Sequence, residues 1–329
     1  MVSNGGSVRV DSEFATLRTV VVAQSQVRAP DDLAALGHAP PVPESARGEI
    51  RSIAGKDFGE VFPREQAVWE AERENLAAVL RKYGVEVLRP RLLTDAEKAA
   101  GGSTGYANFF VRDPWFTVGD HVIEGVLQFP HRRHEILTSR ELLVERVMPS
   151  AAAYVALPSP AIPEPGGEKN GAGPFLEGGD VLVLGQHVFV GESGMATNPT
   201  GREWLAKYLR PHGFTVTVVP MPPHVLHLDC AFGLVREGLI ITCPDRLPAG
   251  LPEPLRDWEQ IVVTEEEAAA MATNGLPIDS STYITDPEFE RVGHALQARG
   301  ITVEYLDFTV SRSFGGAFRC STQPLLRAN

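Results

Sequence analysis

A unit of two strands, one helix and a third strand recurs along this sequence and constrains its fold more than any other feature. Three strand–turn–strand segments carry apolar and β-branched residues on both sides of a short turn, as hairpins do; they span residues 116–125, 183–191 and 232–242. Helical patterns follow the first two, at about 132–148 and 199–212, and further strands follow at 153–157 and 215–219. A repeat of about 50–65 residues is typical of one cyclic or stacked domain, so we expect an α/β architecture of that kind.

Other periodic segments precede and follow these three copies. A strand at 19–23, a helix from Pro63 to Tyr83 and a strand at 85–90 come first. Degenerate copies fit the C-terminal part, with a strand at 260–263, helices at 265–272 and 287–300, and a strand at 302–308. Residues 24–63 are rich in Pro, Gly and Ala and lack sustained periodicity, so we expect a loop or lid insertion there.

The composition is that of an acidic globular protein. The 329 residues include 30 Lys and Arg against 42 Asp and Glu, which gives a net charge of −12 with neutral histidines. This charge argues against nucleic acid or an anionic membrane as the main partner, but it is compatible with small cationic ligands. No apolar run reaches the roughly 18–20 residues that cross a bilayer, and the N-terminus shows no secretory signal. We therefore expect a cytoplasmic protein; its oligomeric state, a homo-oligomer included, stays open.

Polar residues at the ends of apolar strands are the first candidates for chemistry, because α/β folds place their sites there. Asp113 lies in the segment 108–114, between an apolar strand and a proline; a turn aspartate that bonds its own backbone is the alternative. Glu177 and Asp180 flank a pair of glycines, where the backbone bends sharply. A polar hairpin entrance is the alternative there.

A histidine and an aspartate stand two positions apart in the apolar segment 224–232. In a strand, alternate residues point to the same face, so we expect His227 and Asp229 to project together and Cys230 to point away. Two buried polar groups need partners, because burial without them is costly. A satisfied core histidine is the alternative, and a metal site would need further ligands at suitable spacing, which are not evident.

The three cysteines imply no disulfide framework, because their number is odd in a chain of this size. Cys230 and Cys243 stand among apolar strand residues, and we interpret both as core. Cys320 follows a glycine pair near the C-terminus and adjoins Arg319. A nearby cation favours the thiolate, which is the nucleophilic form; an apolar filler is the alternative.

A basic pair, Arg132 and Arg133, opens the helical pattern at about 132–148. One interpretation is a solvated face that caps the helix. The other is a clamp for a carboxylate, which suits the geometry of arginine.

Taken in order, these segments resemble the guanidino-group-modifying enzymes, which include arginine deiminase, dimethylarginine dimethylaminohydrolase and the arginine amidinotransferases. The motifs that carry the resemblance are Arg112-Asp113, Glu177-Gly-Gly-Asp180, His227-Leu-Asp229 and Gly315-Gly-Ala-Phe-Arg-Cys320. Any one of them is weak, but all four in this order are specific, and the resemblance runs from about residue 12 to the C-terminus. It implies the pentein fold, a five-bladed α/β propeller of ββαβ repeats with pseudo-fivefold symmetry, as one catalytic domain over residues 1–329.

The resemblance also implies roles for the candidate residues. Cys320 would attack the guanidinium carbon and form a thiouronium adduct, His227 would act as acid and base, and Glu177 would orient the site. Asp113 and Asp229 would hold the planar guanidinium of a small-molecule substrate. The other candidates for substrate binding are Asp180, Asn108, Arg112, Arg132 and Arg133, the last two for a substrate carboxylate. No metal and no organic cofactor are implied.

Two activities of the family fit the chain. Hydrolysis of arginine or a close guanidino compound, with release of ammonia and a ureido product, is favoured because Glu177 and the segment 319–327 resemble the hydrolases. Transfer of the amidino group of arginine to an amine acceptor, with release of ornithine, is the alternative. A non-catalytic pentein would lack the Cys and His-x-Asp set, and a papain-like hydrolase fits the order of His227 and Cys320 poorly.

Overall fold

A computed structural model gives the structure of residues 7–33, 53–160 and 172–328. Within these ranges it contains five three-stranded sheets and one two-stranded sheet. In each three-stranded sheet the outer strands flank a central strand that pairs antiparallel with one and parallel with the other. Each of these sheets is one copy of the repeat that the sequence predicts.

Four of the sheets are each continuous in sequence. They comprise β5 (Trp115–Val118), β6 (His121–Glu124) and β7 (Ala153–Ala156); β8 (Val181–Leu184), β9 (His187–Glu192) and β10 (Thr215–Pro220); β11 (Phe232–Arg236), β12 (Leu239–Thr242) and β13 (Glu259–Val262); and β14 (Leu276–Asp279), β15 (Thr282–Thr285) and β16 (Thr302–Tyr305). The helices that join the second and third strands are α4 (Glu135–Val147), α5 (Pro199–Leu209) and α7 (Glu290–Gln297). Between β12 and β13 short 3₁₀ turns take the place of that helix.

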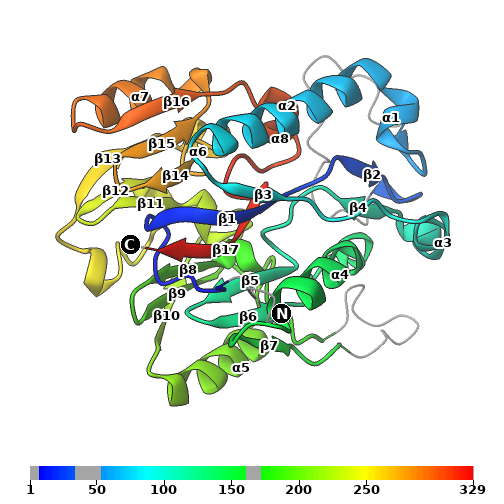
Figure 1. Cartoon of the computed structure of the whole chain (residues 1–329), viewed down its shortest axis with the longest axis horizontal. Coiled ribbons are helices and arrows are strands. Elements are labelled where there is room, and N and C mark those ends of the chain that lie inside the picture. Colours follow the sequence, from blue (N-terminus) through cyan, green and yellow to red (C-terminus); the bar gives the residue numbers. More distant parts are fainter. Residues whose placement is uncertain (1–6, 34–52, 161–171, 329) are drawn as a thin grey trace, which may run out of the picture.

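The remaining three-stranded sheet joins the two ends of the chain. β1 (Thr16–Val22) pairs antiparallel with β17 (Thr322–Ala328) and parallel with β3 (Glu86–Leu88). The helix α2 (Pro63–Lys82) connects this β1 region to β3. In Figure 1, β1 and β17 cross the middle of the molecule and the other sheets lie around them. The last strand therefore completes the first sheet, as a ring of five blades requires.

The helix α2 illustrates how the local sequence determines an element. Pro63 occupies its first turn, where a missing N–H costs nothing. Gly84 follows its end at φ 77°, the left-handed conformation that glycine adopts without strain. Trp69, Leu76 and Leu80 lie on one face and are fully buried. This face packs the helix onto the core. Glu72 and Arg73 are buried as well, whereas most of the other charged residues of α2 are exposed.

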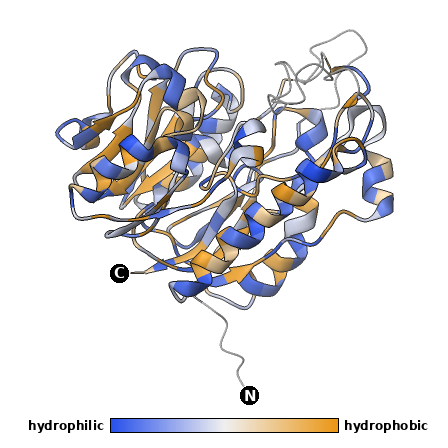
Figure 2. Cartoon of the chain, turned by 90° about the horizontal axis from the view of Figure 1, so that it is seen from above, coloured by the Kyte–Doolittle hydropathy of each residue, from blue (hydrophilic) through white to orange (hydrophobic). Residues whose placement is uncertain are grey.

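Apolar side chains form five clusters, each shared by two neighbouring sheets, and a sixth beside Cys320. Phe116 and Val181, for example, join the β5–β6–β7 sheet to the β8–β9–β10 sheet, and Phe189 and Phe232 join the latter to the β11–β12–β13 sheet. The strands are mostly hydrophobic, whereas the helices carry hydrophilic residues on part of their surface (Figure 2). The core thus lies mainly between neighbouring sheets.

The shorter elements complete the structure. They are β2 (Gln26–Arg28), which pairs with β4 (Tyr106–Asn108), and the helices α1 (Phe58–Val61), α3 (Asp95–Ala100), α6 (Glu265–Ala269) and α8 (Thr309–Ser313). The stretch 24–63 therefore contains a strand and a helix in its described parts and is not simply a loop. Residues 34–52 lie outside the described residues, and a lid role for the stretch stays a prediction.

The expected arrangement of ββαβ repeats is observed, but one local expectation is wrong and one hairpin was not predicted. The segment 224–232 is not a strand: Leu228–Cys230 form a 3₁₀ turn. The hairpin of β14 and β15 was not predicted from the sequence, and it belongs to a fifth copy of the repeat. None of the helices in the described ranges is long and apolar enough to span a membrane.

Candidate active site

A cavity of about 360 Å³ opens beside the loop that precedes β17. Its polar lining includes Asp113, Arg132, His227, Arg246 and Cys320, and its apolar lining includes Phe58, Phe109, Phe110, Phe129 and Phe314. Four of the predicted site residues thus face one cavity although they come from segments far apart in the sequence: Asp113, Arg132, His227 and Cys320.

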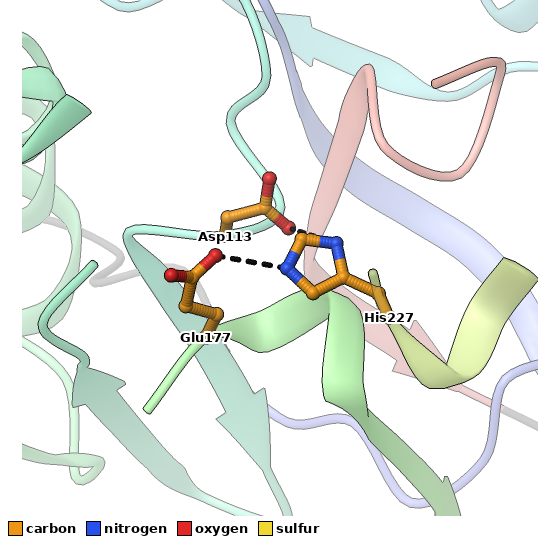
Figure 3. Close-up of side chains that lie close together, drawn as sticks. All are labelled: Asp113, Glu177 and His227. Carbon is orange, nitrogen blue, oxygen red and sulfur yellow. Dashed lines mark hydrogen bonds and ion pairs between the residues drawn. The ribbon is translucent and has the colours of Figure 1, made fainter. Parts of the chain in front are cut away.

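His227 lies between two carboxylates (Figure 3). Its Nε2 is 2.8 Å from Glu177 Oε2, and its Nδ1 is 3.8 Å from Asp113 Oδ1. All three side chains are buried. Burial alone would lower the pKa of His227, but the charge of Asp113 and the hydrogen bond with Glu177 outweigh it and raise the pKa to about 10. The imidazole is therefore a cation at neutral pH and has a proton to donate.

The Glu-Gly-Gly-Asp segment approaches this histidine closely because it contains glycine. A Cβ on Gly179 would lie 2.6 Å from His227 Nδ1 and 2.8 Å from Asp113 Oδ1. In its absence, the backbone N–H of Gly179 donates to Asp113 Oδ1 at 3.1 Å. The Glu-Gly-Gly-Asp motif therefore places Glu177 on one side of the imidazole, and its Gly179 N–H fixes Asp113 on the other side.

Cys320 is almost fully buried at the cavity wall. Its Sγ lies 3.2 Å from Asn274 Nδ2 and 3.6 Å from Asp229 Oδ2. Burial and the charges of Asp229 and Asp113 hold the pKa of the thiol well above its usual range. A cation bound beside the sulfur would oppose this effect, so the site suits a positively charged substrate.

Asp229 is fixed by Arg319, the residue before Cys320. Arg319 Nη1 donates to Asp229 Oδ2 at 2.8 Å, and the other two nitrogens donate to Glu13 at 3.0 and 3.1 Å. Burial alone would lower the pKa of Arg319, but the charges of Glu13 and Asp229 raise it. The ion pair fixes one carboxylate of the predicted guanidinium clamp next to the sulfur.

Asp113 is fixed in a similar way by Arg132. Arg132 Nη2 donates to Asp113 Oδ2 at 2.9 Å, and Nη2 and Nε donate to Glu135 at 2.7 and 3.1 Å. The guanidinium also lies 5.3 Å from the centre of the Phe109 ring. Two buried carboxylates thus bind Arg132, which also lines the cavity, and its expected role in binding a substrate carboxylate stays a prediction.

Known proteins resemble this chain in both sequence and fold. No family model matches the chain. The chain is 30% identical over 290 residues to a putative inosamine-phosphate amidinotransferase 2 of Streptomyces griseus, covering 78% of this chain and 80% of the relative. The inosamine-phosphate amidinotransferase 1 of the same organism is 28% identical over 285 residues, with the same coverage.

This chain belongs to the pentein superfamily of guanidino-group-modifying enzymes. Among solved structures, SxtG, an amidinotransferase of the saxitoxin biosynthetic pathway from Microseira wollei, superposes with a TM-score of 0.78 at 21% identity, over 98% of both chains. A dimethylarginine dimethylaminohydrolase superposes with a TM-score of 0.63 at 18% identity, over 94% of this chain and all of the other. The predicted fold and the prediction of an enzyme that modifies guanidino groups are both confirmed.

Asn108 and Asp180, two predicted substrate-binding residues, do not line the cavity of this pentein. Asn108 Nδ2 donates to Gln26 Oε1 at 2.9 Å and so joins β4 to β2. Asp180 accepts the backbone N–H of Leu228 at 3.0 Å. Burial raises the pKa of Asp180 to about 7. Because Leu228 follows His227, Asp180 fixes the backbone that carries the histidine and does not reach the cavity itself.

Arg112 and Arg133 also lie away from the cavity lining. Arg112 is buried, and its Nε donates to the carbonyl of Arg319 at 3.2 Å. Burial and the charge of Arg319 lower the pKa of Arg112 to about 9. Arg133 donates to the carbonyls of Leu127 and Gln128 at 3.1 and 3.0 Å. Both arginines bond backbone carbonyls away from the cavity lining, so their contacts within the described ranges do not support their expected role in binding a substrate, which stays a prediction.

Sequence reasoning missed two residues of this site. Arg246 lines the cavity, and its Nε and Nη2 donate to Glu265 at 2.8 and 2.6 Å. It stands just beyond β12, and the rule that polar residues follow strand ends could have found it. Asn274, which contacts Cys320, precedes the hairpin of β14 and β15 that the sequence analysis did not detect, so no signal pointed to it.

Within the described ranges, one group of side chains has the spacing of metal ligands: Asp113, Glu177 and His227, whose ligand atoms lie within 4.8 Å of one another. His227 Nε2 already bonds Glu177 Oε2 at 2.8 Å, and Asp113 Oδ2 is 2.9 Å from the Arg132 cation. A nearby fixed cation disfavours a divalent ion. The group fits an acid–base arrangement better than a metal centre.

Proposed function

We propose that this enzyme transfers the amidino group of arginine, or of a close guanidino compound, to an amine acceptor through a covalent adduct on Cys320. The observation that carries the proposal is the similarity to two Streptomyces griseus amidinotransferases over 78% of the chain. The sequence motifs by themselves favour hydrolysis instead. Among the solved structures named above, the amidinotransferase SxtG is 21% identical and the dimethylarginine dimethylaminohydrolase 18%, so their likeness concerns the fold and not the reaction.

The first half of the reaction uses the two fixed carboxylates. Asp113 and Asp229 would bind the guanidinium by charge-assisted hydrogen bonds, which orient its carbon toward Sγ. The bound cation lowers the pKa of the Cys320 thiol, whose proton leaves to solvent. The thiolate then forms a bond with the guanidinium carbon.

Collapse of this intermediate releases the donor amine. The bond from the carbon to the substituted nitrogen breaks, and the His227 cation donates its proton to that nitrogen. With arginine as donor, ornithine leaves and the amidino group stays on Sγ. Glu177 keeps the imidazole in position through the bond to Nε2.

The second half runs the same steps with a new amine. Neutral His227 accepts a proton from the acceptor, whose nitrogen bonds to the amidino carbon as the C–S bond breaks. The thiolate is restored and a new guanidino compound leaves.

The surroundings of the sulfur favour an amine over water in this step. Phe109, Phe110 and Phe314 line the cavity next to Cys320. Apolar walls offer few partners for ordered water, so they extend the lifetime of the adduct. We also propose that the chain acts as one catalytic domain, since β17 completes the sheet of β1.

Product analysis with arginine labelled at the guanidino carbon tests this function. The enzyme is incubated with glycine, lysine and an inosamine phosphate in turn, and with no acceptor. We expect ornithine and an equal amount of a new labelled guanidino compound with at least one acceptor, and no product from Cys320→Ser. Labelled citrulline with ammonia, independent of any amine, would establish a hydrolase instead.

A further inference from the structure

The turn between α6 and β14 contacts both segments that carry the chemistry. Asn274 in this turn is fully buried, and its Nδ2 lies 3.2 Å from Cys320 Sγ. Thr273, its neighbour, donates from Oγ1 to the carbonyl of Asp229 at 2.8 Å. The carbonyl of Asn274 accepts the N–H of Arg319 at 3.1 Å. One turn thus joins the His-x-Asp segment to the cysteine loop.

The direction of the Asn274 amide is set by its backbone partners. Its Oδ1 accepts the N–H of Ala317 at 2.9 Å and the N–H of Cys320 at 3.1 Å. An NH₂ group cannot accept from two N–H donors, so the atom at that position must be the oxygen. The NH₂ group therefore points at Sγ, where it can only donate.

The backbone of the same turn adopts a conformation that other residues avoid. Met271 has φ 79° although it is not a glycine. Such a residue persists only where its surroundings hold it, and these positions cluster at functional sites. Met271 itself lines the cavity.

The other groups around the sulfur are charged or titratable. Asp229, Asp113 and Cys230 disfavour a negative sulfur, and Arg319 favours it. Arg73 is buried on α2 and donates to Ser321 Oγ at 2.6 Å. Its charge acts on the sulfur of Cys320 from α2. Asn274 differs from all of these because it is a neutral donor in direct contact with Sγ.

We propose that Asn274 is a positioning residue for the nucleophile: its amide holds the Cys320 loop through Oδ1 and stabilises the thiolate through Nδ2. The inference rests on the proposed role of Cys320. In this proposal one buried side chain both fixes the position of the Cys320 sulfur and favours its ionisation.

Substitution of Asn274 by aspartate separates these two functions. Asn274→Asp keeps oxygen acceptors for the two backbone N–H groups but replaces the donor at Sγ with an oxygen. The measurement is the rate of alkylation of Cys320 by iodoacetamide as a function of pH, which needs no turnover. We expect the midpoint of this profile to rise by about one to two pH units, with kcat reduced at neutral pH.

Asn198→Asp is the matched control. Asn198 caps α5 by accepting the N–H of Gly201, and aspartate caps a helix equally well. We expect its alkylation profile to equal that of the wild type. Asn274→Ser, which adds no charge, should also raise the midpoint.

Unchanged profiles in both folded Asn274 variants would overturn the inference. If neither variant folds, the wild type decides: the NMR signal of the Asn274 side-chain amide should shift as Cys320 ionises and stay constant in Cys320→Ser. An amide signal that ignores this ionisation would contradict the proposal. Full turnover by Cys320→Ser would instead refute the proposed function and leave the alkylation result intact.

Discussion

Arg319 and Asp229 form a buried ion pair, and the Asp229 oxygen that accepts from Arg319 at 2.8 Å is also the one 3.6 Å from the sulfur of Cys320. The residue that precedes the nucleophile therefore fixes one of the carboxylates that would hold the substrate. The pair couples the cysteine loop to the His-x-Asp segment.

Removal of this arginine should destabilise the fold strongly. Arg319→Met leaves Glu13 and Asp229 buried without their cation, which costs about 3–5 kcal/mol of unfolding free energy. Urea denaturation measures the change. Arg299→Met, which removes the surface pair with Glu259, should cost about 0–1 kcal/mol; equal effects of the two substitutions would contradict the role given to the buried pair.

Glu13 should contribute stability only above acidic pH. Burial alone would raise its pKa, but Arg319 and Arg112 lower it from 4.5 to about 2. The contribution is therefore present above pH 4.5 and is lost as the pH falls toward 2. The difference in unfolding free energy between wild type and Glu13→Gln should shrink over that range, whereas Glu237→Gln, at an exposed position, should show no such trend.

His227 should show the opposite dependence on pH. Its pKa rises from 6.5 to about 10 because Asp113 and Glu177 outweigh the effect of burial. Its contribution is fully present below pH 6.5 and is lost as the pH rises through about 10. The stability difference between wild type and His227→Gln should fall across this window. A constant difference, equal to that of the exposed control His294→Gln, would show that the imidazole is not held as a cation.

Gly179 should tolerate no side chain. The Cβ of Gly179→Ala would displace His227 or Asp113, and a misplacement of about 1 Å in a reacting group can cost about 100-fold in rate. We expect kcat/KM to fall by about that factor. Gly84→Ala introduces strain after α2 but meets open space, so it should lower the melting temperature and leave kcat/KM unchanged. Full activity of Gly179→Ala would mean that this contact does not matter.

The repeat could be predicted from the sequence because hairpins and amphipathic helices are encoded locally. The hairpin of β14 and β15 escaped detection because Pro277 and Asp279 interrupt its apolar pattern. His227 and Asp229 were predicted to lie together on the assumption of a strand, whereas the structure has a 3₁₀ turn at Leu228–Cys230, and their roles in the site stay predictions. The alternation of side chains in a strand therefore does not explain why His227 and Asp229 lie near each other; their positions depend on the 3₁₀ turn and on contacts with other segments.

The arginines show the limit of local reasoning more clearly. Arg132 and Arg112 occur in polar segments that suggest a substrate site, but Arg132 pairs with Asp113 from another segment and Arg112 bonds Arg319 near the C-terminus. Only the fold reveals that Arg132 binds Asp113 and Glu135, and that Arg112 donates to the carbonyl of Arg319. Asn274 was not predicted for the same reason, because its contact with Cys320 joins two segments 46 residues apart that share no motif.

The mass of the adduct on Cys320 tests the central claim most directly. The enzyme is mixed with arginine without an acceptor, quenched in acid and measured intact and after proteolysis. Transfer predicts that Cys320 gains one amidino group alone and that one equivalent of ornithine is released. A hydrolase would break the other C–N bond and leave the whole ornithine skeleton on the sulfur. That heavier adduct, or no adduct on Cys320 while product accumulates, would contradict the account.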